Sequence, residues 1–187
     1  MKMTQTPQSE ALAADQFNGF GGATRVHCRQ EDLQWLREFF CPSLQCGLQE
    51  PVTETVLART DPSLYEELHA QFESSTPRDW ECFTLDGRFE TFPGCRTTDG
   101  DILISLDRFR LMLRMSHSRQ TCELTAAHPA AKFRLGLMRI VRELATVRAI
   151  RAGAVPFHGA VCADPRGSTG FLGVKTAGKS TSLVHSL

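Results

Sequence analysis

The stretch Gly173-Val174-Lys175-Thr176-Ala177-Gly178-Lys179-Ser180 has the pattern G-x-x-x-x-G-K-S of a Walker A phosphate-binding loop. The apolar run Gly170-Phe171-Leu172 precedes it, and Thr181-Ser182-Leu183-Val184-His185 follows with a composition that suits the start of a helix. Strand, glycine-containing loop and helix N-terminus are the context that this motif needs. The sequence therefore predicts an α/β fold in which a strand leads into a nucleotide-binding loop.

Each part of this loop has a chemical reason to hold phosphate. Successive backbone N–H groups converge on phosphate oxygens, and the following helix adds unpaired donors and the positive end of its dipole. Lys179 is expected to contact the outer phosphates and Ser180 to place its hydroxyl on Mg²⁺. We therefore expect residues 173–181 to bind ATP with Mg²⁺. The alternative is a glycine-containing surface turn, which the preceding strand disfavours.

Charge is distributed unevenly along a chain whose formal net charge is zero. Residues 1–100 carry 8 basic and 16 acidic side chains, and residues 101–187 carry the remaining 13 basic and 5 acidic ones. The zero total gives no global field to attract nucleic acid, whereas a basic half with a phosphate loop fits a nucleotide. An acidic domain that rests on a basic one explains the same asymmetry.

Cysteine usage and the N-terminus predict a cytoplasmic protein. The seven cysteines form no C-x-x-C motif and no Cys/His spacing typical of zinc, so we expect reduced thiols, mostly in the core. The polar start Met1-Lys2-Met3-Thr4-Gln5 contains no apolar signal segment. No run approaches the ~18 apolar residues of a membrane helix, and we expect no membrane partner.

The front of the chain is predicted to be a variable α+β domain over residues 23–128. Residues 1–22 are polar and small and end in Gly19-Phe20-Gly21-Gly22, which predicts a disordered tail with a glycine hinge. Asp61-Pro62 is expected to begin a helix as N-cap and first helical residue. Apolar periodicity predicts strands at 24–28 and 53–59, helices at 31–40 and 62–73, and an antiparallel meander at 80–126 with an Asp86-Gly87 hairpin turn.

Residues 129–187 are predicted to begin a second domain. A long helix is expected at 130–151, with Gly153 as its C-cap. Strands are expected at 155–163 and 169–172, with a turn at 164–167 between them. The predicted apolar stripe of the helix is Phe133, Leu137, Ile140, Val141, Leu144 and Val147, and the basic row beside it is Lys132, Arg134, Arg139, Arg142, Arg148 and Arg151.

The stretch Phe157-His158-Gly159-Ala160-Val161, followed by the loop and Thr181, resembles the HPr kinase/phosphorylase family and its relatives in peptide-modifying gene clusters. The resemblance implies ATP-dependent phosphorylation of a serine on a protein or peptide, by a P-loop core related in fold to phosphoenolpyruvate carboxykinase. By motif position, His158 and Lys179 correspond to active-site residues and Ser180 to a magnesium contact. On its own, a histidine in an apolar strand is more often structural. The helix and meander before this stretch fit the family only loosely.

Two departures from the family pattern leave other interpretations open. Lys175-Thr176 stand where the family has Ser-Gly, and a threonine resists the positive φ that glycine tolerates. The family's catalytic aspartate lies beyond the loop helix, so we expect this chain to be the front part of a longer protein and inactive by itself. The alternatives are a nucleotide-binding regulatory module without transfer activity and an inactive gene fragment. The oligomeric state stays open.

Overall fold

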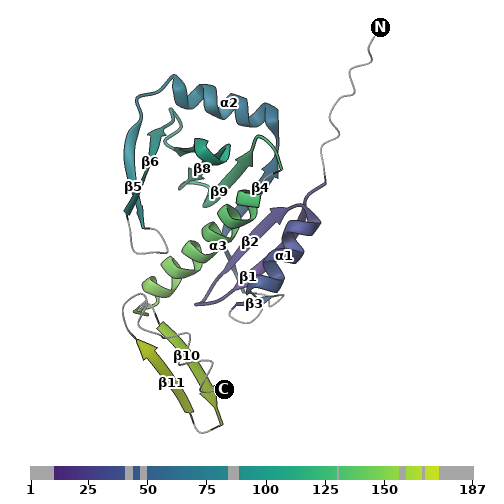
Figure 1. The fold of residues 1–187 in the computed structure, drawn as a ribbon, viewed down its shortest axis with the longest axis vertical. Coiled ribbons are helices and arrows are strands. Elements are labelled where there is room, and N and C mark those ends of the chain that lie inside the picture. The colour runs from purple at the N-terminus through teal and green to yellow at the C-terminus, as the bar shows by residue number, and fades with distance from the viewer. Residues whose placement is uncertain are drawn as a thin grey trace.

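The computed structural model describes residues 11–40, 44–46, 50–83, 89–129, 131–155, 159–165 and 167–172, and it is an α/β structure with two sheets (Figure 1). The larger sheet has the strand order β3-β1-β2-β4-β9-β8-β7-β6-β5, and β10 pairs with β11 in the smaller one. Among the described residues, no helix is long and apolar enough to cross a membrane. The strands of the larger sheet are β1 (Ala13–Asn18), β2 (Ala23–Cys28), β3 (Gln45–Cys46), β4 (Val52–Thr60), β5 (Arg78–Phe83), β6 (Phe89–Arg96), β7 (Ile102–Leu106), β8 (Leu111–Ser116) and β9 (Thr121–Ala126).

Strand β1 lies within the residues that were predicted to be a disordered tail, and for this strand that prediction is wrong. β1 pairs with β2 in antiparallel register from Ala13↔Cys28 to Asn18↔Ala23. The glycine-rich stretch between them is a tight turn in which the Gly19 N–H donates to the Gly22 carbonyl at 3.0 Å. Both central residues have positive φ, 61° at Phe20 and 78° at Gly21, as a type I′ hairpin turn requires. The front domain therefore includes β1, ahead of the predicted boundary at residue 23.

The centre of the larger sheet is parallel and its far side is an antiparallel meander. β2, β4 and β9 run parallel, and helix α1 (Gln30–Phe40) lies in the crossover from β2 to β4. β5 to β9 pair in sequence order, which confirms the predicted meander. The predicted Asp86-Gly87 turn lies outside the described residues. β8 begins at Leu111 because a 3₁₀ turn, η1 (Asp107–Phe109), and a left-handed Arg110 precede it.

Helices cover both faces of this sheet (Figure 1). α1 and α3 (Ala131–Arg151) share one core, and α2 (Pro62–Glu73) packs in a second core on the opposite face. Side chains alternate between the faces of a strand. Leu111 accordingly joins the α1/α3 core, and its neighbour Met112 joins the α2 core.

Helix α3 confirms the predicted long helix but corrects the assignment of two side chains. Phe133, Leu137 and Val141 are buried as predicted. Val147, which was placed in the apolar stripe, is 41% exposed, and Arg148, which was placed in the solvated basic row, is buried. Buried Leu137 and Val141 are spaced by four residues, and Arg148 follows Val141 by seven, so Arg148 continues their line towards the sheet.

The chain leaves α3 through a short turn and forms the β10–β11 hairpin. Gly153 has a φ of 87°, as expected of a C-terminal cap. β10 (Gly159–Asp164) and β11 (Gly167–Leu172) pair in antiparallel register, which confirms the predicted strand pair over the described positions. The hairpin lies beyond the C-terminal end of α3, apart from the larger sheet (Figure 1).

Candidate functional site

The candidate nucleotide site is attached to the open end of the β10–β11 hairpin. The register runs from Asp164↔Gly167 at the turn to Gly159↔Leu172 at the open end. His158 directly precedes Gly159, and Gly173 directly follows Leu172 in the sequence. The hairpin thus pairs Gly159, the residue after His158, with Leu172, the residue before Gly173. All of the predicted site residues, His158 and 173–181, lie outside the described residues.

Several positions of the hairpin are exposed to solvent. Gly159 and residues 167–170 are exposed, as is Val161 at 54%. A Cβ added at Gly170 would meet no atom within 4 Å. A two-stranded hairpin by itself is only marginally stable in water. The strands that feed the predicted loop therefore need further packing to become rigid.

Arg148 ties the last turns of α3, the helix that leads into this hairpin, to the larger sheet. Its Nη1 donates to Thr24 Oγ1 at 2.7 Å and pairs with the carboxylate of Glu54. Its Nε donates to the Gly19 carbonyl at 3.3 Å. Burying a charge is costly unless it is paired and hydrogen-bonded, and Arg148 has both kinds of partner. The C-terminal end of α3 is thereby held against β2, β4 and the β1–β2 turn.

A second buried charge joins α1 to α3. Asp32 is fully buried, and its two carboxylate oxygens accept from Arg29 Nε at 3.0 Å and Arg134 Nε at 2.7 Å. With the Glu54–Arg148 pair, this confirms that the acidic front half and the basic long helix are partly paired. The charge asymmetry of the sequence is therefore in part structural.

A polar cluster on the opposite face of the sheet was missed by the sequence analysis. Asp107 Oδ1 accepts from the Tyr65 hydroxyl at 3.4 Å and lies 3.4 Å from His69 Nε2. The Arg110 guanidinium lies 5.1 Å from the centre of the Tyr65 ring. Burial, followed by the nearby Asp107 charge, raises the pKa of Tyr65, so its hydroxyl stays a donor. These contacts fix α2 against η1, and we assign the cluster a structural role.

Two described cysteines, Cys28 and Cys122, are poor nucleophiles. Burial raises the pKa of Cys28 to about 12, with a further contribution from Asp32. Burial likewise raises the pKa of Cys122 to about 11, with Glu54 adding to it. Both thiols therefore stay protonated at neutral pH. Within the parts of the chain that the structure describes, no three His, Cys, Asp or Glu side chains are grouped to hold a metal ion.

Comparison of the chain with protein-family models, with curated proteins and with solved structures finds no match.

Proposed function

We propose that this chain carries the nucleotide-binding loop of an HPr kinase-like enzyme that transfers phosphate from ATP to a serine of a protein or peptide. The observation that carries the proposal is the register of the β10–β11 hairpin, with Gly159 opposite Leu172. The stretch that resembles the family places His158 directly before Gly159 and Gly173 directly after Leu172 in the sequence. β11 is followed by a sequence that predicts a loop and a helix start, the order that a phosphate loop needs.

In the proposed mechanism, the loop positions the phosphates and stabilises the negative charge that develops on the phosphoryl group in the transition state. Backbone N–H groups of residues 173–180 hold the phosphate oxygens, and Lys179 offsets charge on the transferring group. Ser180 would hold Mg²⁺, which supplies charge neutralisation between the outer phosphates. His158, which directly precedes β10 in the sequence, is expected to lie beside the loop. The base that accepts the serine proton comes from a part of the protein outside these segments.

A nucleotide-binding regulatory module is the second candidate. Lys175-Thr176 occupy the middle of the loop, where the related kinases have Ser-Gly. A threonine does not readily adopt the positive φ that glycine allows there. Such a loop holds a nucleotide in a different shape without aligning its outer phosphate for transfer.

Calorimetry of the full chain with Mg-ATP tests the binding step. Lys179→Ala is expected to weaken binding by about 1–3 kcal/mol, the scale of a hydrogen bond to a charged group. Lys175→Ala is the matched control, because it removes the same side chain from a position that the motif does not fix. Equal affinities of the wild type and Lys179→Ala would remove the phosphate-loop assignment.

Transfer of labelled phosphate from ATP to serine peptides then separates the two candidates. The kinase hypothesis expects single-turnover transfer by a form of the protein that also supplies the base. Binding of Mg-ATP without transfer by that form would favour the regulatory module.

A further inference from the structure

The outer face of α3 combines exposed cations with exposed apolar side chains. We define this outer face by Leu135, Arg139, Arg142, Thr146 and Ile150, whose spacing of three or four residues places them on one side of a helix. The buried side chains of α3 lie on the opposite side, against the sheet. Leu135 is 42% exposed and Ile150 50% exposed.

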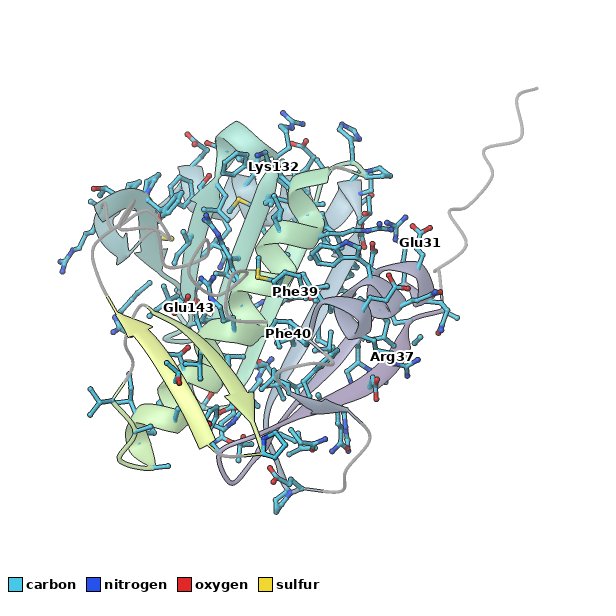
Figure 2. The ribbon with its side chains drawn as sticks, turned by 60° about the horizontal axis from the view of Figure 1, so that its bottom comes forward. Glu31, Arg37, Phe39, Phe40, Lys132 and Glu143 are labelled. Atoms are coloured by element: carbon cyan, nitrogen blue, oxygen red, sulfur yellow. The ribbon has the colours of Figure 1, made fainter. Side chains whose placement is uncertain are left out.

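The cations of α3 fall into two groups according to the side of the helix. On the inner side, Arg134 pairs with Asp32 and Arg148 with Glu54. On the outer side, Arg139 is exposed and no ion pair joins it to another residue in the described ranges. Arg142 pairs with its neighbour Glu143, which is labelled in Figure 2. Among the described residues, the outer face therefore keeps the positive charge of Arg139 without an ion-pair partner.

We propose that the outer face of α3 is a docking surface for an acidic segment of the phosphoacceptor, one that also carries apolar side chains. This inference rests on the proposed kinase function. Charge complementarity favours an acidic partner, because Arg139 forms no ion pair with any residue that the structure describes. Leu135 and Ile150 select apolar side chains in that partner, because burying their exposed area is favourable.

The dimensions of the outer face suit a short segment. Leu135 and Ile150 are separated by fifteen residues of helix, which span about 22 Å at 1.5 Å per residue. A helical partner segment of about fifteen residues covers that length. Nucleic acid would use the cations but leave the two apolar side chains without a partner.

The position of α3 also links the docking surface to the candidate site. α3 ends at Arg151, Gly153 turns the chain, and β10 begins at Gly159. In Figure 1 the hairpin continues beyond the C-terminal end of α3. A segment held on α3 therefore lies beside the element that feeds the phosphate loop, which raises the local concentration of its serine there.

Fluorescence anisotropy with a labelled fifteen-residue helical peptide of Glu, Leu and Ala tests the docking surface on the full chain. Binding is expected to weaken about tenfold in Arg139→Glu, which replaces an attraction by a repulsion, and also in Ile150→Ser. Arg119→Glu is the matched control, because Arg119 is an exposed cation in the β8–β9 turn. Labelled peptides with Lys in place of Glu, or Ser in place of Leu, should show the same anisotropy with the protein as in buffer alone.

The same variants separate failure of docking from failure of the proposed function. The proposal expects Arg139→Glu and Ile150→Ser to bind Mg-ATP as the wild type does, while Lys179→Ala keeps peptide affinity. If the wild type binds the acidic peptide but not Mg-ATP, the proposed kinase function is overturned and the outer face of α3 is still an acidic-peptide site. Equal peptide affinity of the wild type and Arg139→Glu would overturn the docking surface alone.

Two further measurements can assign the outer face to another partner. Sedimentation at increasing protein concentration would overturn the proposal if it showed self-association that Arg139→Glu abolishes. Flotation with phosphatidylserine vesicles would overturn it if the protein bound them through Arg139 more tightly than it binds the acidic peptide. The proposal expects a constant sedimentation coefficient and no flotation.

Discussion

The guanidinium of Arg148 on α3 pairs with the carboxylate of Glu54 on β4, a residue 94 positions earlier in the sequence. Both side chains are largely withdrawn from solvent. Arg148 also donates to Thr24 and Gly19, so one side chain joins α3, β2, β4 and the β1–β2 turn. The end of α3 that leads to the hairpin is therefore fixed from within the front domain.

We expect Arg148→Met to lower the free energy of unfolding by about 3–5 kcal/mol, because it leaves the Glu54 carboxylate buried without its cation. Arg151→Met is the control, since Arg151 is exposed and its loss should change stability by about 0.5 kcal/mol or less. Urea unfolding of both variants gives the comparison. The double variant Arg148→Met/Glu54→Gln should recover part of the loss. Equal stability of the two single variants would contradict the role of the pair.

Phe20 is expected to lower stability through its backbone conformation. It is 54% exposed and holds a φ of 61° at the first central position of the type I′ turn, which Asn and Gly favour. Phe20→Asn should therefore raise the free energy of unfolding by about 1 kcal/mol. Phe20→Ala is the control, because it removes the ring and keeps the steric cost of a Cβ. Thermal or urea unfolding in which Ala stabilises as much as Asn would assign the effect to the ring.

Asp101 should make the meander sensitive to acid. A hydrogen bond from Ser116 lowers the pKa of this buried carboxyl, and Arg114, whose Nε lies 2.8 Å from it, lowers it further against the effect of burial. A lowered folded-state pKa gives stability that is present above the unfolded pKa, about 3.9, and is lost as pH falls through the folded value. The urea midpoint should therefore fall more steeply below about pH 4 in the wild type than in Asp101→Asn. Parallel pH profiles of the two proteins would contradict this.

Local sequence chemistry was sufficient to predict most helices and strands. The Asp61 carboxylate accepts from the Leu64 N–H at 3.0 Å, as expected from Asp-Pro at a helix start. The meander followed from alternating apolar residues between turn residues. β1 was missed because Gly19-Phe20-Gly21-Gly22 is compatible with a flexible hinge as well as with a tight turn. Only its pairing with β2, which buries Phe17, distinguishes the two.

Non-local relationships were beyond the sequence analysis. The parallel pairing of β2 with β4 and of β4 with β9 joins segments that are far apart in the chain, and no turn specifies it. The buried state of Arg148 depends on Glu54 and Thr24 being brought beneath it by that pairing. For the candidate site, the pairing of the two strands was predicted correctly. The positions of His158 and Lys179 stay predictions.

The purified chain is expected to hydrolyse or transfer no phosphate. Phosphoryl transfer of this kind needs one acid that positions the nucleophile and usually a second that holds the metal. From residue 130 onward the acidic side chains are Glu143 and Asp164. Glu143 is on the exposed side of α3 and pairs with Arg142.

Asp164 lies opposite Gly167 at the turn of the hairpin, whereas the loop begins after Leu172 at the open end. Five residue steps along a strand separate these two ends by about 17 Å. At that distance from the start of the loop, the Asp164 side chain is not expected to orient a nucleophile at a phosphate that Lys179 would hold. The measurement is release of phosphate from Mg-ATP by the purified chain, with Lys179→Ala as the control for contaminating activity. Turnover above buffer that disappears in Lys179→Ala would show that an acid of the front domain completes the site.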